Sequence, residues 1–166
     1  LDLSRREIEA AGYKGERVAL LVPTDIPSTN ALAEVTADLF RKLGLNLDAQ
    51  AMDWGTAVQR RTNMEPPERG GWSVFQTSWS GLEHATPAGH PFLRGNGRAA
   101  APGWPDSPVI ETLRDEWLRA PDEATQFSLA EQLQAQAFRD VPYVPLGQQF
   151  QQTAYRAELA GILPGL

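Results

Sequence analysis

The stretch VALLV at residues 18–22 decides the fold, and a proline closes it. A continuous apolar run of this length is typical of a strand that is covered on both faces, as in a parallel sheet. The apolar residues of segment 30–43 then recur at helical spacing, with Ser28 or Asn30 available as the N-cap and Gly44 directly after the segment. We therefore expect a buried strand followed by a helix.

Two further strands are predicted downstream. Residues 45–51 alternate strictly between apolar and polar side chains, which is the period of a half-covered strand. Asp53 is placed to cap a short helix that runs to Arg61, and the β-forming residues of segment 72–79 follow a loop rich in proline and glycine. Strand, helix, strand, helix and strand predict a right-handed βαβαβ unit. The predicted fold class is α/β with a mainly parallel sheet.

The flanking segments predict helices and an ordered loop. Residues 1–11 suit a short amphipathic helix, and residues 87–108 combine many prolines with apolar side chains, as an ordered surface loop does. Start signals at Ser107-Pro108 and at Pro121-Asp122 predict two helices that form a hairpin. The second should reach about residue 140 and bury Phe127, Ala130, Leu133 and Ala137.

Short edge strands are expected near the carboxyl terminus. Tyr143, Val144 and Leu146 are accompanied by Pro142 and Pro145, which cannot donate to a ladder, so only an edge or strand-start segment is predicted there. A last short strand is predicted over residues 153–155.

Length and composition limit the class of protein. The 166 residues, 42% hydrophobic and 22% charged, fit one compact domain with a single core. A formal charge of −6 argues against a nucleic-acid partner. The sequence holds no apolar run of the roughly 20 residues that a membrane-spanning helix requires, and its start does not have the pattern of a signal peptide. It also has no cysteine, which excludes disulfides and thiolate chemistry.

Ligands of open α/β sheets bind beyond the carboxyl ends of the strands. Trp54 follows the second predicted strand, and Trp79 lies at the end of the third, so both indoles fall on this rim. An indole offers a rigid face for stacking and one N–H donor. The alternative is that each ring only caps the core, a packing role that we also assign to Trp72, Trp104 and Trp117.

Catalytic and metal-binding patterns are weak. Glu83, His84 and His90 are the candidates for a metal site, but their spacing matches no recognised ligand pattern, and a solvated or supporting role is the alternative. The sequence shows no serine elbow, phosphate loop or HExxH helix. We expect neither catalysis, nor a cofactor, nor a bound metal.

Five runs of the sequence resemble the carboxy-terminal half of the family 5 extracellular solute-binding proteins, the receptors for dipeptides, oligopeptides, nickel and related solutes in ATP-binding-cassette (ABC) importers. The runs are AGYKGERVALLV (11–22), TADLFRKLGLNLDAQAMDWGT (36–56), GGWSVFQTSWSG (70–81), GWPDSPVIETLRDEWLRAPD (103–122) and DVPYVPLGQ (140–148). The resemblance implies that residues 1–166 form one domain, the second lobe of a larger two-lobed receptor, truncated at both ends. It also implies a periplasmic or extracellular location and association with permease subunits in the membrane.

The resemblance also implies ligand contacts. In the peptide-binding branch a Trp after the second strand and a Trp after the third contact the peptide, at positions that match Trp54 and Trp79. Basic residues that serve ligand carboxylates in some relatives fall at Arg61 and Gln76. The branch places an amine-binding Asp where this chain has Leu82, and the neighbouring Glu83 takes that role only if the loop shifts by one residue.

Our first hypothesis is therefore a solute receptor that binds a peptide or another small organic molecule without breaking a bond. The absent lobe would cover the solute. The predicted ligand-binding residues are Trp54, Arg61, Gln76, Ser78, Trp79, Ser80, Gly81 and Glu83. The alternatives are a metal-dependent hydrolase and an interaction domain without a pocket, the latter favoured if both indoles are fully covered.

Overall fold

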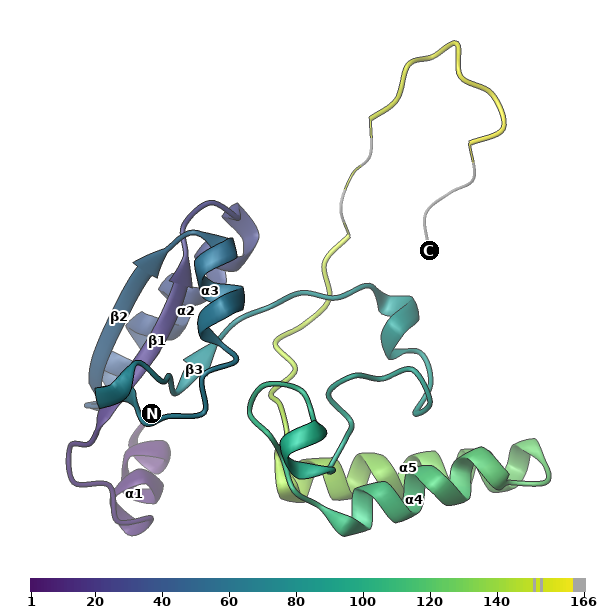
Figure 1. Cartoon of the computed structure of the whole chain (residues 1–166), viewed down its shortest axis with the longest axis horizontal. Coiled ribbons are helices and arrows are strands. Elements are labelled where there is room, and N and C mark those ends of the chain that lie inside the picture. The colour runs from purple at the N-terminus through teal and green to yellow at the C-terminus, as the bar shows by residue number, and fades with distance from the viewer. Residues whose placement is uncertain (151, 153, 163–166) are drawn as a thin grey trace. The chain divides into compact units, whose positions relative to one another are not determined.

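The computed structural model describes residues 1–150, 152 and 154–162 (Figure 1). The chain divides into two compact units, Leu1–Ser78 and Trp79–Leu166, which we call the first and second units. The sequence predicted one hydrophobic core, but two separate core clusters are present, one in each unit. That residues 1–166 form one lobe of a larger receptor stays a prediction.

The first unit is the predicted βαβαβ arrangement, preceded by a helix. Its parallel sheet has the strand order β2-β1-β3, with β1 in the centre. Residues 67–69 form a single 3₁₀ turn before the last strand. The elements are α1 (Asp2–Ala10), β1 (Arg17–Pro23), α2 (Pro27–Leu43), β2 (Asn46–Met52), α3 (Trp54–Arg60) and β3 (Val74–Phe75).

The core of the first unit lies between β1 and α2. Leu20 and Val22 on one face of β1 pack with Ala33 and Ala37 of α2, and these four residues are buried. Leu21, on the opposite face of the strand, is also wholly buried. The prediction of a strand covered on both faces is thus confirmed, and Figure 1 shows α2 and α3 flanking the sheet.

Helix α2 differs from its prediction in its start and in its buried face. It begins at Pro27, with Ile26 as the N-cap residue, because proline suits the first helical position. The predicted caps Ser28 and Asn30 are therefore wrong, whereas Gly44 ends the helix with a φ of 82°, as predicted. The helix buries the small residues Thr29, Ala33 and Ala37, while Val35 is 69% exposed and Leu39 41% exposed.

Strand β3 is shorter than the predicted segment 72–79. Only Val74 and Phe75 pair with β1. The Ser73 side chain takes part in the pairing directly before them: its hydroxyl oxygen accepts from the Ala19 N–H at 3.1 Å, and the Ser73 N–H donates to the Ala19 carbonyl at 2.8 Å. Side-chain bonding of this kind competes with a regular ladder.

The second unit is a helical hairpin joined to a long loop. Helices α4 (Pro108–Arg119) and α5 (Glu123–Asp140) lie side by side (Figure 1). Ser107 caps α4 as predicted, and Asp122 of the second start signal is the N-cap residue of α5. Leu93, Ile110 and Leu133 form the core, against which Trp117 packs. The prediction that Phe127 is buried is wrong: the ring is 67% exposed, and α5 buries Leu129 together with Leu133.

The loop over residues 87–108 is ordered by polar bonds to α4. The Arg114 guanidinium donates to the Pro87 and Ala88 carbonyls at 3.0 and 3.2 Å. The Glu111 carboxylate binds both the Arg94 guanidinium at 3.0 Å and the Gly95 N–H at 2.8 Å. The expectation of an ordered surface loop is therefore confirmed.

The predicted edge strands are not found in the described part of the chain. Residues 143–146 form no strand, in keeping with Pro142 before the segment and Pro145 within it, and neither do Ala154 and Tyr155. Thr153 lies outside the described residues. None of the helices that the structure describes combines the length and apolar character needed to cross a membrane.

Candidate functional site

Capping interactions shape the carboxyl rim of the first unit's sheet. Asp25 follows β1, and its carboxylate accepts from the Trp54 N–H at 2.8 Å, which ties the ends of β1 and β2 together. Asp53 caps α3 through the Thr56 N–H at 2.9 Å and the Thr56 hydroxyl at 2.6 Å. These bonds hold the pKa of Asp53 below its ordinary value. Both rim carboxylates are thus used to position Trp54.

Arg61 lies between two aromatic rings at this rim. Its guanidinium carbon is 5.9 Å from the centre of the Trp54 ring and 5.8 Å from that of Phe75. The Arg61 carbonyl accepts from the Trp72 indole N–H at 2.9 Å, and Trp72 meets Phe75 edge to face with ring centres 4.8 Å apart. Trp54 and Arg61 are therefore held together, as a ligand-binding pair requires.

The Arg61 guanidinium has no carboxylate partner among the residues that the structure describes. Arg17 of β1, in contrast, binds Asp48, which also accepts from Gln50. A half-buried cation that only aromatic faces accompany is available to an incoming anion.

Gln76 and Ser78 differ in accessibility. Gln76 is 5% exposed, and its amide nitrogen donates to the Thr36 hydroxyl of α2 at 2.9 Å, so the side chain faces the interior of the first unit. Its amide oxygen is buried and has no hydrogen-bond partner. Ser78 is exposed. The predicted contact of Gln76 with a ligand stays a prediction, but this arrangement does not offer the amide to solvent.

Trp79 opens the second unit and is held by an aromatic cluster. Its ring is 43% exposed and meets Phe92 edge to face, with ring centres 5.7 Å apart. Phe92 in turn packs against Tyr143 at 5.9 Å, and Tyr143 against His90 at 5.2 Å. Trp79 is thus partly open to solvent and contacts Phe92, through which it is linked to the other two rings of the cluster.

Glu83 is engaged by the turn that follows Trp79. Its carboxylate accepts from the Ser80 N–H at 3.2 Å and from the Ser80 hydroxyl at 2.9 Å, which completes a capping box over the 3₁₀ turn Gly81–His84. Ser80, Gly81 and Glu83 are all exposed, and Leu82 is 67% exposed. An amine-binding role for Glu83 would compete with this cap.

The two histidines make an aromatic pair. The rings of His84 and His90 meet edge to face with centres 4.4 Å apart. Within the described ranges, no group of three or more His, Asp or Glu side chains has the geometry of a metal site. The alternative of a metal-dependent hydrolase therefore has no support from the geometry.

His90 is buried, so the solvated role that the sequence left open for it is wrong. The ring is 8% exposed; Nδ1 accepts from the Leu93 N–H at 3.1 Å, and Nε2 lies 3.0 Å from the Tyr143 hydroxyl. Burial, together with His84 and Arg114 nearby, lowers the pKa of His90 to about 4. The imidazole is thus neutral at pH 7. Burial also raises the pKa of Tyr143.

The structure brings together some of the predicted residues. Trp54 and Arg61 form one cluster, and Ser80 and Glu83 form another. Because Trp54 and Trp79 belong to different units, the predicted sandwich between them stays a prediction. Full coverage of both indoles would have favoured a domain without a pocket, but neither ring is fully covered.

Sequence reasoning did not find the supporting rings Phe75, Phe92 and Tyr143. Their aromatic character was visible, but the pairs Trp79–Phe92 and His90–Tyr143 join residues on separate loops. Phe75 had a local signal, because it belongs to the same predicted strand segment as Trp72 and Trp79.

Comparison with known proteins identifies a relative of this chain. No protein-family model matches the chain. The chain is 34% identical over 161 residues to the probable peptide ABC transporter periplasmic-binding protein y4tO of Sinorhizobium fredii (strain NBRC 101917 / NGR234). The chain is similar to part of an ABC-transporter binding protein. The match covers 97% of this chain and 30% of the relative, so the chain spans about a third of the relative's length.

A solved structure agrees on the fold. The dipeptide binding protein from Pseudoalteromonas sp. SM9913, crystallised in complex with Met-Leu, superposes with a TM-score of 0.54 at 16% identity. The superposition covers 85% of this chain and 28% of that chain. The resemblance to periplasmic solute-binding proteins of ABC transporters and the α/β fold class are both confirmed.

Proposed function

We propose that this chain forms part of the substrate-binding component of an ABC importer and binds a peptide or another small organic solute at the carboxyl rim of its sheet. The observation that carries the proposal is the Arg61 guanidinium, held between Trp54 and Phe75 and without a carboxylate partner among the described residues. The similarity to a probable peptide-binding relative supports the same function.

Arg61 suits a carboxylate of the solute. A guanidinium presents N–H donors in a planar fork that matches a carboxylate, and contact with two rings reduces the conformational freedom lost when the ligand binds. Trp54 adds a rigid apolar face at the same place. A peptide carries both features, a terminal carboxylate and side chains that stack on an indole.

The other predicted contacts lie in the segment from the end of β3 to the 3₁₀ turn Gly81–His84. Ser78, Ser80 and Gly81 are exposed and offer hydroxyl and backbone groups, and Trp79 offers its open indole face. Contact of Gln76 with the solute requires its amide to leave Thr36, and contact of Glu83 with a peptide amine requires the carboxylate to leave Ser80.

In this proposal the chain breaks no bond. A second lobe closes over the solute, and the ligand stabilises the closed form by contacting both lobes at once. The closed receptor then delivers the solute to permease subunits from the periplasm or the cell exterior.

The test is isothermal titration calorimetry of a receptor that contains this chain together with its second lobe. The titrants are a panel of dipeptides that includes Met-Leu, each as the free acid and as the carboxyl-terminal amide. Arg61→Met should weaken binding of the acids by at least about tenfold, because a charge-assisted hydrogen bond contributes roughly 1.5–3 kcal/mol. It should change binding of the amides little.

Trp54→Ala and Trp79→Ala should weaken binding of both forms. Arg6→Met is the matched control, because Arg6 is an exposed arginine of α1 in the same unit as Arg61, remote in sequence from the rim. If no dipeptide of the panel binds, the peptide assignment fails. Unchanged affinities in Arg61→Met, Trp54→Ala and Trp79→Ala would remove the rim as the binding site.

A further inference from the structure

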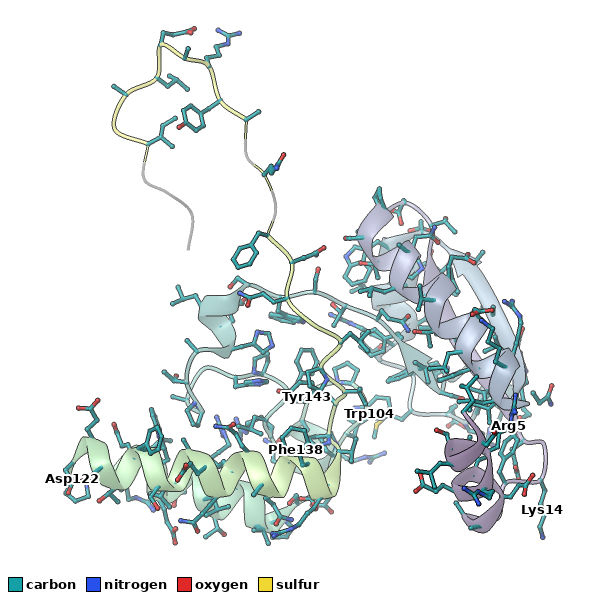
Figure 2. All side chains as sticks on the ribbon, turned by 180° about the vertical axis from the view of Figure 1, so that it is seen from behind. Arg5, Lys14, Trp104, Asp122, Phe138 and Tyr143 are labelled. Carbon is teal, nitrogen blue, oxygen red and sulfur yellow. The ribbon has the colours of Figure 1, made fainter. Side chains whose placement is uncertain are left out.

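The second unit contains a cavity that the rim residues do not line. Its volume is about 330 Å³, within the range of small-molecule sites. Helix α5 provides Ala130, Leu133 and Phe138, and the loop after Trp79 provides His84 and His90. Tyr143 completes the wall, and Figure 2 shows it on the segment that follows α5, close to Phe138.

The wall of this cavity combines apolar side chains with the polar side chains of Thr86, Gln134, Tyr143 and the two histidines. Among the described residues that line it there is no Asp, Glu, Lys or Arg. Leu93 and Leu133 belong to the core of the unit, so this side of the cavity is fixed by packing. His90 is buried and its pKa is lowered to about 4, so it contributes no charge at neutral pH. The cavity therefore favours a ligand without a net charge.

Besides the side chains of Thr86 and Gln134, the Tyr143 hydroxyl and one nitrogen of His84 remain available for hydrogen bonds in it. Because His90 Nδ1 accepts from the Leu93 N–H, the neutral ring carries its proton on Nε2 and donates it to the Tyr143 oxygen. The Tyr143 hydroxyl proton then has no acceptor among the described residues. His84 uses Nδ1 toward the Ser80 carbonyl at 3.1 Å, which leaves Nε2 as an acceptor in the neutral ring.

We propose that this cavity is a second binding site, which takes an uncharged, mainly apolar small molecule with one hydrogen-bond acceptor placed on the Tyr143 hydroxyl. The site differs in chemistry from the Arg61 rim. A zwitterionic peptide would have to leave both termini without an opposite charge in the cavity, at a high desolvation cost. A neutral aromatic ketone fits the walls and offers a carbonyl to Tyr143.

The test is a titration of the isotope-labelled 166-residue chain with acetophenone, followed by ¹H–¹⁵N correlation spectra. The expected result is saturable shifts at amides of α5 and of residues 84–93, with a dissociation constant below about 10 mM. Tyr143→Phe should weaken binding about three- to tenfold, the effect of one lost hydrogen bond. Benzoate, of similar size but charged, should bind at least about tenfold more weakly.

Two α5 variants separate cavity binding from surface binding. Ala130→Phe fills the cavity and should abolish the saturable shifts, whereas Ala135→Phe adds the same ring at an exposed position outside it and should not. Circular dichroism checks that both variants are folded. The proposal is overturned if acetophenone produces no saturable shifts, if benzoate binds equally well, or if folded Ala130→Phe or Tyr143→Phe binds like the parent chain.

Discussion

The first unit is stabilised mainly by apolar burial, and the second depends in addition on polar anchors. In the first, Leu20 and Leu21 are wholly buried in a strand that lies at the centre of the sheet. In the second, the loop over residues 87–108 has no sheet to join, and its backbone is held by Arg114, which is itself only 7% exposed. A long loop can thus be ordered by side chains that satisfy its carbonyls in place of a ladder.

The largest expected effect is the loss of that anchor. Arg114→Met keeps much of the side-chain volume but leaves the Pro87 and Ala88 carbonyls without their donor. We expect the second unit to lose about 2 kcal/mol of unfolding free energy, since a hydrogen bond to a charged group contributes roughly 1.5–3 kcal/mol. Hydrogen exchange, measured separately for amides of the two units during urea titration, checks this expectation.

The matched control is Arg119→Met on the same helix. Arg119 is exposed and pairs only with Asp115, so its loss should cost less than about 0.5 kcal/mol. Equal effects of the two substitutions would contradict the anchoring role of Arg114. Equal loss of protection in both units would contradict the separation of their stabilities.

An intermediate effect is expected from pH. His90 has a pKa of about 4 in the folded chain against an ordinary 6.5, so the unfolded state binds the extra proton between these values. Stability of the second unit is therefore fully present above about pH 6.5 and falls as the pH drops toward 4. Urea midpoints measured across this window should decline for the parent chain.

His90→Gln supplies the comparison for this decline. A glutamine can still accept from Leu93 and donate to Tyr143, but it does not titrate. The decline between pH 6.5 and 4 should be smaller in this variant, while the carboxylates, Glu111 among them, contribute equally to both proteins. Identical pH profiles would show that His90 is not the titrating group.

The smallest effect concerns the ends of two helices. Helix α2 ends on Gly44 with φ 82°, whereas α5 ends on Val141 with φ 47°, a conformation that a β-branched residue adopts only with strain. Gly44→Ala should cost the first unit about 1 kcal/mol, and Val141→Gly should stabilise the second by about the same amount. Thermal unfolding checks both. Destabilisation by Val141→Gly would mean that contacts of the valine side chain outweigh its backbone strain.

The fold could be predicted where one local signal dominated. The apolar run at residues 18–22, Gly44, the cap Ser107 and the start signal at Pro121-Asp122 all act within a few residues, and a strand or a helix end lies at each of them as predicted. The burial of Phe127 was predicted wrongly, because helical periodicity does not say which side of an apolar stripe meets the neighbouring helix. Strand β3 was overestimated at both ends: at its start the Ser73 hydroxyl replaces part of the ladder, and pairing with β1 ends at Phe75.

For the candidate site, residue type and position at a strand end were enough to select Trp54, and the resemblance to the solute-binding proteins added Arg61, which lies in contact with it. They were not enough for Gln76, whose amide binds Thr36 on a helix far away in the sequence. The cavity was missed for the same reason, since His84, Leu133 and Tyr143 come from three separate segments. Long-range placement of this kind leaves no periodic signal.

The choice of small residues on the sheet-facing side of α2 has an evolutionary consequence. Ala33 and Ala37 are almost fully buried against β1, so a larger side chain at either position would push the helix away from the strand. Descendants of a common ancestor should therefore retain Ala, Gly or Ser at these two sites. Val35 and Leu39 lie on the outer side of the helix and can be replaced by polar residues in related proteins unless another surface covers them. Apolar residues retained at these two positions would therefore indicate such a covering surface.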